Sequence, residues 1–371
     1  MNAEENNIPG LYLHIPFCDG KCSYCAFYSI KYSKKLATNY LSALECEMNN
    51  FAPLMPKTIY IGGGTPSILL VGQLERLCES IHRHVCMNSL KEWSVEINPG
   101  TISSDKLQVL LEAGVNRISM GAQSFNEHVL QWLGRRHTVS DTLEAVDIIR
   151  NAGVTNLSLD LIACVPNLSG SDWANTIQQA LALGPEHLSI YALTDEEGTE
   201  LRQSVLNGKF KMLKEDEQLQ ALELAEDILT ASGYARYEIS NYAKSGLECR
   251  HHISCWRGEQ YIGLGPAAAS HIGIKRRVNK PDLFLYIEAI QNGQVPPYYE
   301  EVLSADVERL DQIIFGLRMA EGISTELAFN YQDTFQALQA ESLVVRQDNR
   351  WKLTNKGRNV ADAVALELMS N

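Results

Sequence analysis

Three cysteines near the start of the chain, Cys18, Cys22 and Cys25, have the spacing to hold a metal centre. They follow a short apolar segment in a C-x3-C-x2-C pattern, and Gly20 lets the loop between them bend. Three thiolates cannot complete a four-cysteine zinc site, and Phe27 stands where a fourth thiolate would be expected. In a four-iron–four-sulfur (4Fe-4S) cluster, three thiolates would leave one iron open to another ligand. The pattern therefore indicates a catalytic type of centre, and the alternative is three unrelated free cysteines.

The elements that would position these cysteines alternate between short β-rich segments and longer amphipathic helical segments, from residue 10 to about 235. Six strand–helix units in succession predict a parallel sheet with right-handed crossovers. Six units rather than eight predict an α/β fold with an open, partial (β/α)6 barrel, whose loops after the strands carry the chemistry. The expected strands cover residues 11–15, 58–62, 93–98, 117–121, 157–161 and 187–192, and the expected helices cover 35–50, 71–84, 104–113, 140–152, 173–183 and 216–231.

A glycine-rich turn and several polar residues fall at the ends of these expected strands. The GGGTP stretch at 62–66 would let the backbone come close to a ligand, although a plain strand-to-helix turn would use glycines too. No Lys-Ser/Thr pair follows it, which argues against a phosphate-binding loop. Glu96 could take the hydroxyl or amino groups of a nucleoside, or it could be solvated or salt-bridged. Asp160 lies in so apolar a segment that its carboxylate needs a partner.

These features resemble the radical S-adenosylmethionine (SAM) superfamily and, within it, the coproporphyrinogen III oxidase-like proteins. Tyr12, His14 and the Ile15-Pro16 pair lead into Cys18 as they do in those proteins. The resemblance implies a 4Fe-4S cluster on the three cysteines, with the amino and carboxylate groups of SAM on the open iron. An arginine such as Arg135 suits that carboxylate through a bidentate contact. The positions that the resemblance places around SAM are Tyr12, Tyr24, Gly63, Gly64, Thr65, Glu96, Gln123, Arg135 and Asp160.

Residues 248–256, with the sequence ECRHHISCW, form a second distinctive stretch. It resembles the C-R-H-N-x-x-Y-W segment of the HemW-type heme chaperones. The matching positions are Cys249, Arg250, His251 and Trp256. His252 replaces the Asn of that pattern, and Cys255 replaces the Tyr. Histidine and cysteine both ligate heme iron in principle, so His251 is the predicted heme contact. The alternative is a structured loop in which His251 bonds to the backbone.

The chain is predicted to divide into a barrel at 1–235, a barrel extension with the His- and Gly-rich segment at 236–298, and a C-terminal part at 299–371. The last part shows a helix, a helix, a small hairpin and a helix, which resembles a small winged-helix-like α+β module. Its alternative role is a lid or a packing module. The formal net charge of −13 argues against nucleic acid as a partner, because nucleic-acid binding needs a basic face.

The sequence also bears on the location of the protein. It contains no apolar run long enough to cross a membrane, and its N-terminus lacks the pattern of a secretory signal. The nine cysteines include no disulfide framework, which favours a reducing cytoplasm. A transient association with a membrane stays open.

Two features favour the HemW-type heme chaperones over the true oxidases. Ala26-Phe27 stands where the oxidases carry a further cysteine, and the arm before the first expected strand has only about ten residues. The resemblance therefore implies a chaperone that binds heme, a 4Fe-4S cluster and SAM and transfers heme to an acceptor protein. The alternative is an oxygen-independent oxidase that decarboxylates coproporphyrinogen III to protoporphyrinogen IX. A third interpretation is a structural metal protein.

Overall fold

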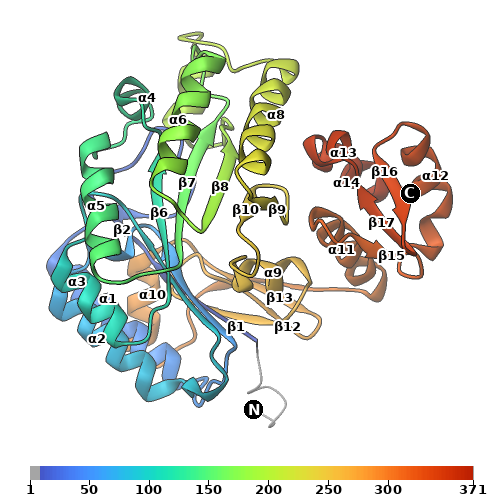
Figure 1. The fold of residues 1–371 in the computed structure, drawn as a ribbon. Helices are drawn as coiled ribbons and strands as arrows, with labels where there is room; N and C mark the ends of the chain where they lie inside the picture. The colour runs from blue at the N-terminus through green and yellow to red at the C-terminus, as the bar shows by residue number, and fades with distance from the viewer. Residues whose placement is uncertain (1–8, 371) are drawn as a thin grey trace.

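The computed structural model describes residues 9–370, which form one large mixed sheet and a smaller C-terminal module (Figure 1). Six parallel strands follow one another in chain order within a twelve-stranded sheet. The strand order is linear, so the sheet does not close, and the expected partial (β/α)6 barrel is confirmed. The six strands are β1 (Gly10–Ile15), β4 (Thr58–Gly63), β5 (Glu92–Ile97), β6 (Arg117–Gln123), β7 (Leu157–Ala163) and β8 (His187–Ala192).

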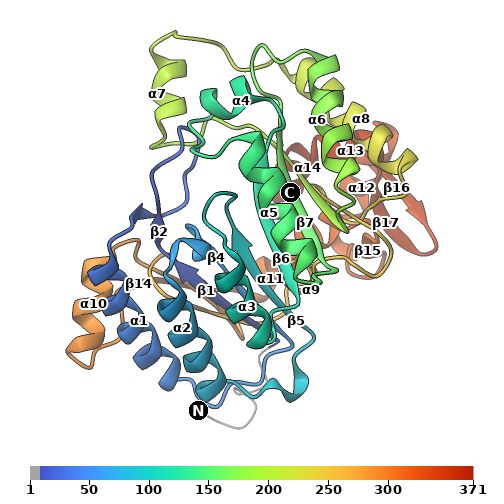
Figure 2. The same cartoon turned by 60° about the vertical axis from the view of Figure 1, so that its left-hand side comes forward.

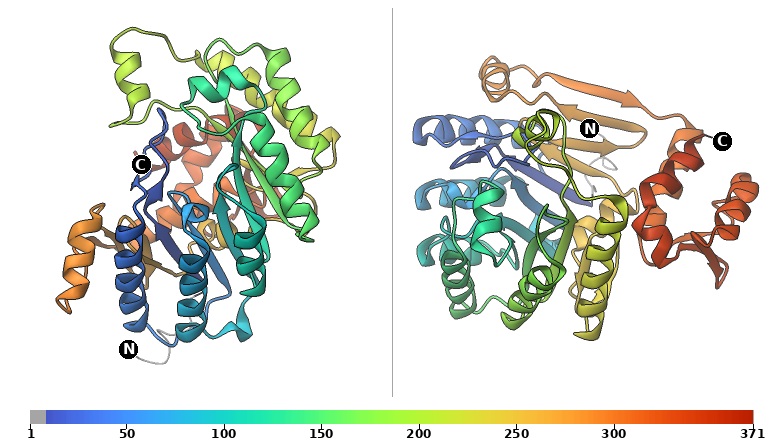
Figure 3. Two further views of the ribbon diagram at one scale, coloured as in Figure 1. Left: turned by 90° about the vertical axis from the view of Figure 1, so that its left-hand side faces the viewer. Right: turned by 90° about the horizontal axis from the view of Figure 1, so that it is seen from above.

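Helices that connect these strands cover the outer side of the curved sheet (Figure 3). Several of them begin at a side chain that satisfies a free backbone N–H group. The Ser103 hydroxyl accepts from the N–H of Lys106 at 3.4 Å, and the Thr138 hydroxyl accepts from that of Asp141 at 3.2 Å. The covering helices are α1 (Lys34–Asn49), α2 (Val71–His84), α3 (Ser104–Glu112), α5 (Val139–Asn151), α6 (Gly170–Ala182) and, after the last of the six strands, α8 (Glu215–Ala231). The short helices α4 (Glu127–Trp132) and α7 (Glu200–Leu206) lie at one end of the barrel (Figure 2).

Strands from later in the chain extend both edges of the parallel core. β10 (Asn241–Ala243) pairs antiparallel with β8, and β9 (Ala235–Arg236) follows it at that edge. β11 (Tyr261–Leu264) pairs parallel with β1 at the other edge. Three antiparallel strands continue the sheet from there, namely β12 (Ala269–Ile272), β13 (Lys275–Asn279) and β14 (Tyr298–Val302).

The structure differs from the sequence-based expectation in part of this extension. The stretch 248–256, for which the sequence analysis offers a structured loop, contains a helix, α9 (Arg250–Trp256). Its start is held by a carboxylate far away in the sequence, Glu92. The strands β13 and β14 were not expected, because their sequences carry charged residues and they form strands by pairing with β12 and with each other. β14 lies beyond residue 298 and still belongs to the large sheet, while the division into three parts stays a prediction.

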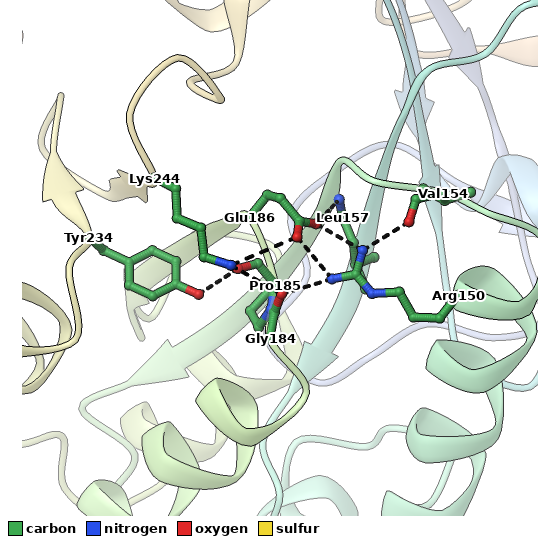
Figure 4. Close-up of polar contacts among 8 residues, drawn as sticks. All are labelled: Arg150, Val154, Leu157, Gly184, Pro185, Glu186, Tyr234 and Lys244. Carbon is green, nitrogen blue, oxygen red and sulfur yellow. Dashed lines mark hydrogen bonds and ion pairs between the residues drawn. The ribbon is translucent and has the colours of Figure 1, made fainter.

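A polar network around Glu186 joins the starts of β7 and β8 to the helices behind them (Figure 4). Its carboxylate accepts from the Arg150 guanidinium at 2.9 and 3.2 Å and from the Leu157 N–H at 3.0 Å. The Lys244 ammonium lies 3.8 Å from the same carboxylate. The Tyr234 hydroxyl donates to the carbonyl of Pro185. The network fixes the end of the barrel opposite the predicted site.

The C-terminal module has its own apolar core, in which the Phe335 and Trp351 rings stack with centroids 5.0 Å apart. Three short antiparallel strands and flanking helices give the expected winged-helix-like arrangement, with the last expected helix divided at Val360. The elements are α11 (Ala305–Arg318), β15 (Ile323–Ser324), α12 (Gln332–Ala340), β16 (Val344–Gln347), β17 (Arg350–Leu353), α13 (Asn355–Asn359) and α14 (Ala361–Met369). The helix α10 (Leu283–Gln291) precedes the module and packs on α1.

The module contacts the barrel through polar and aromatic groups. The Arg358 guanidinium donates to Glu226 of α8 at 3.1 Å, and the Ala320 N–H donates to the Tyr237 carbonyl at 2.9 Å. Phe315 of α11 meets Trp256 of α9 edge to face, with ring centroids 5.9 Å apart. No helix within residues 9–370 combines the length and the apolar character that are needed to span a bilayer.

Candidate functional site

A cavity of about 860 Å³ lies at the carboxyl ends of the parallel strands. All three cysteines of the C-x3-C-x2-C pattern line it, together with the glycine-rich turn after β4 and the ends of β5 to β8. Because parallel strands place their carboxyl ends at one edge of a sheet, residues that are far apart in the sequence meet here. This cavity is therefore the place to test the predicted cluster and SAM residues.

The cysteine loop lies between two short paired strands, β2 (Phe17–Cys18) and β3 (Ile30–Lys31), and reaches towards α4 and α7 (Figure 2). The Ser23 N–H and hydroxyl both donate to the carbonyl of Leu133 at the end of α4, at 3.2 and 3.0 Å. The Ser23 carbonyl accepts from Leu201 of α7 at 2.8 Å. These bonds hold the loop against the barrel.

The loop offers thiols to a cluster rather than to a single ion. Within residues 9–370, no three His, Cys, Asp or Glu side chains are close enough together to hold one metal ion. A cubane spreads its thiolates over separate iron atoms, so three thiols on one cavity wall fit the cluster better. Burial raises the pKa of Cys25, and the positive charge of Lys21 opposes this effect. The Arg135 guanidinium donates to the Cys22 sulfur at 3.6 Å, so this contact helps to fix the loop beside the wall of the cavity.

Two buried carboxylates line the floor of the cavity. Glu96 accepts from the Tyr60 hydroxyl at 2.8 Å and from the Gly63 N–H at 3.2 Å. Burial raises its pKa to about 7, and the charge of Asp160 adds to this rise. Burial also raises the pKa of Asp160, against hydrogen bonds from nearby serines. A cationic ligand with hydroxyl groups would compensate both groups.

Arg135 and its neighbours form the wall between the carboxylates and the cysteines. Its guanidinium donates to the Asn98 side chain at 2.7 Å and to the Gly121 carbonyl at 2.9 Å. Its Nε has no hydrogen-bond partner, although it is buried. Gln123, at the bulged end of β6, has a φ of 65°, a strained left-handed conformation for a residue with a side chain. These contacts thus hold the wall in one geometry, and the Nε of Arg135 stays available as a hydrogen-bond donor for a ligand.

Eleven of the residues predicted to hold the cluster or SAM line the cavity, and Tyr12 does not. The lining residues are Cys18, Cys22, Cys25, Tyr24, Gly63, Gly64, Thr65, Glu96, Gln123, Arg135 and Asp160. The Tyr12 ring stacks on Tyr60, with centroids 6.3 Å apart, and its hydroxyl bonds to His14 at 3.1 Å. Tyr12 therefore packs against Tyr60, which bonds to Glu96, and does not itself line the cavity.

Sequence reasoning missed several lining residues. Asn98 follows β5 directly and connects the hydroxyl of Thr65 to Arg135, with the bond to Thr65 at 2.8 Å. Its place at a strand end was the signal that could have found it. Ser119 lies two residues before Gly121 on β6 and so points to the same face. Tyr191, in the last parallel strand, also lines the cavity.

His251 lies at the other end of the barrel, away from the cavity. Its Nδ1 lies 2.9 Å from the Thr58 hydroxyl, and its ring stacks on Tyr60 at 5.2 Å. Only 4% of the residue is exposed, and burial lowers the pKa of the imidazole to about 4. The sequence prediction of a heme contact therefore falls on a side chain that already serves the packing of α9.

Comparison with known proteins identifies the family. The model of the radical SAM superfamily matches residues 12–180. A Bacillus subtilis (strain 168) protein named "Heme chaperone HemW" is 33% identical over 95% of this chain and 97% of its own length. This chain belongs to the HemW family of radical SAM proteins. The HemW protein of Escherichia coli (strain K12) is 36% identical over 70% of this chain and 68% of its own.

A solved structure of a protein with a different name has the same fold as this chain. The coproporphyrinogen III oxidase (HemN) from Escherichia coli, whose structure title calls it a radical SAM enzyme, superposes with a TM-score of 0.84. The match covers 99% of this chain and 91% of that chain, at 23% sequence identity. At this identity the similarity shows a shared fold and leaves the activity open. It confirms the predicted fold class, including the C-terminal module.

Proposed function

We propose that this protein is a heme chaperone that binds heme and transfers it to an acceptor protein. The observation that carries the proposal is the match to curated heme chaperones along nearly their whole length, 97% for the Bacillus subtilis protein. A match of this extent includes the barrel, the extension and the C-terminal module. We also propose the cytoplasm as the location, because an oxygen-labile cluster and free thiols persist in a reducing compartment.

The cavity at the carboxyl ends of the parallel strands, called the first cavity from here on, would hold the cofactors that the radical SAM family implies. Cys18, Cys22 and Cys25 would hold a 4Fe-4S cluster, and that cluster would supply an iron with an open position for the amino and carboxylate groups of SAM. The Arg135 guanidinium, with its unpaired Nε, would orient the carboxylate of SAM. The buried carboxylate of Glu96 would accept from the hydroxyl or amino groups, and this contact would favour its ionised form.

Heme is cargo in this proposal, and the stretch 249–256 is its proposed contact region, with His251 as the residue named by the resemblance. The acceptor would be a protein that requires heme. The alternative function, oxidative decarboxylation of coproporphyrinogen III, would use the same first cavity. The shared fold with the oxidase fits both functions, so the discriminating test must follow heme and product together.

The experiment uses the full chain, reconstituted anaerobically with iron and sulfide. Hemin is titrated into the protein and followed by absorbance, and transfer is followed by adding an apo-hemoprotein with a distinct spectrum. A parallel sample receives SAM, a reductant and coproporphyrinogen III, and protoporphyrin is measured by fluorescence. We expect stoichiometric heme uptake and transfer without protoporphyrin. Protoporphyrin formed over many turnovers would overturn the chaperone proposal, and so would a lack of heme uptake.

A further inference from the structure

A second cavity, of about 370 Å³, lies where α9 meets the strands β12 and β13 and the helix α11 (Figure 1). Three side chains that can ligate iron line it: His252 and Cys255 of α9, and His271 of β12. His252 and Cys255 are three residues apart, so they share one face of α9. Residues from two separate elements therefore bring metal donors to one cavity.

His271 lines this cavity and has one ring nitrogen without a hydrogen-bond partner among the described residues. This nitrogen, Nε2, is buried. Burial and the charge of Arg276 lower the pKa of His271, while a hydrogen bond to the backbone of Gly273 opposes them. A histidine held through one ring nitrogen presents the lone pair of the other, which is the usual arrangement of a metal-binding imidazole. Burial also lowers the pKa of His252 to about 3.

The walls of the second cavity include aromatic rings that suit a flat aromatic ligand. The Trp256 and Phe315 rings meet edge to face, 5.9 Å apart, and line the cavity with Tyr261. The Arg276 guanidinium lies 5.5 Å from the centre of the Phe315 ring and is paired with Asp311. Aromatic faces pack on a porphyrin plane, and an arginine can meet a carboxylate.

The position of the second cavity also fits a cargo site. Tyr191 lines both cavities, so the second cavity lies next to the predicted SAM site. Phe315 belongs to the C-terminal module, so the cavity is completed only where the module meets the barrel. A macrocycle that enters by one edge would leave its other edge available to an acceptor protein.

We propose that heme binds in the second cavity with its iron on His271, while Cys255 and His252 of α9 line the same cavity beside the macrocycle. The inference rests on the proposed function and assigns its heme site. It differs from the resemblance, which names His251, because His251 lines neither cavity and its Nδ1 is already paired with Thr58.

The test compares ligand variants of the full, anaerobically reconstituted chain during hemin titration. The variants are His271→Ala, Cys255→Ser, His252→Asn and His251→Gln. The matched controls are His128→Ala and Cys46→Ser, which remove an exposed imidazole and an exposed thiol. Affinity is measured from the Soret absorbance, and the iron ligands are identified by electron paramagnetic resonance of the ferric complex. Circular dichroism confirms that each variant is folded.

We expect His271→Ala to weaken heme binding by about tenfold or more and to remove the imidazole signature of the iron. Cys255→Ser and His252→Asn should alter the spectrum, while His251→Gln should keep the imidazole signature. Tight heme binding with an unchanged spectrum in the His271, Cys255 and His252 variants would overturn this inference and leave the proposed function standing. Loss of the signature in His251→Gln alone would also overturn it. No heme uptake by the unmodified chain would overturn the proposed function itself.

Discussion

Removal of the Glu92 side chain should lower the stability of the barrel at the end opposite the first cavity. It is 3% exposed, and it lies at the start of β5 under the helix that carries the heme-motif residues. Its carboxylate accepts from the backbone N–H groups of Arg250 at 2.8 Å and His251 at 3.1 Å. The thiol of Cys249 lies 3.4 Å from the same carboxylate. We therefore expect Glu92→Ala to release the first turn of α9.

The size of the effect follows from these contacts. A hydrogen bond to a charged group contributes about 1.5–3 kcal/mol, so two of them give about 3–6 kcal/mol. Glu92 also faces Arg117, which is fully buried and whose guanidinium nitrogens have no hydrogen-bond partner in the described part of the chain. Glu92 and Arg117 form no direct ion pair, so the loss of their attraction adds to the effect without setting its size. We therefore expect a loss of about 3–6 kcal/mol, set by the two hydrogen bonds.

The assay is urea unfolding followed by circular dichroism, together with amide hydrogen exchange of a peptide that covers 249–257. Glu92→Gln keeps one acceptor oxygen and loses the charge, so we expect about half the loss of Glu92→Ala. Glu144→Ala on the exposed side of α5 is the control. An alanine variant within about 1 kcal/mol of the unmodified protein, with unchanged exchange in this peptide, would refute the reasoning.

Three further predictions concern the first cavity. Gly121→Ala should weaken SAM binding measured by calorimetry, because its new Cβ would lie 2.7 Å from the Gln123 amide. An unchanged affinity would contradict the placement of SAM beside Gln123. Because burial raises the Glu96 pKa from 4.5 to about 7, the folded protein holds this proton more tightly than the unfolded chain does. The free energy of unfolding should thus fall by about 3 kcal/mol as the pH rises from 4.5 to 7. Urea titrations of Glu96→Gln should show a smaller dependence of this free energy on pH. The same pH dependence in the variant and in the unmodified protein would argue against the raised pKa of Glu96. Cys25→Ala should abolish the visible absorption of the reconstituted cluster while the exposed Cys46→Ala keeps it; retention of full iron content by Cys25→Ala would exclude Cys25 as a ligand.

Much of the barrel could be predicted because its signals are local. Alternating strand and helix patterns, helix-start residues such as Ser103 and the spacing of the cysteines all lie within a few turns of chain. The carboxyl ends of parallel strands then bring polar strand-end residues together without further information. Glu96 and Asp160 were therefore named from their positions at strand ends, Arg135 was named from the resemblance, and each of the three lines the first cavity.

The extension was harder to predict because its partners are distant in the sequence. The acceptor that starts α9 is Glu92, which is 158 residues before Arg250. The strands β13 and β14 carry charged residues and become strands only by pairing with each other and with β12. A local pattern contains no signal for such pairings, because their stability comes from the partner segment.

The sequence by itself determined that the chain carries a three-cysteine loop, a polar set of strand ends and two adjacent histidines near residue 251. Only the tertiary structure decided what each histidine faces. Consecutive residues on a helix point about 100° apart, so the packing of α9 turns His251 towards Thr58 and His252 towards the second cavity. His271 joins His252 there through a strand pairing that no spacing in the sequence reveals, because the contact depends on how the sheet edge and α9 pack together.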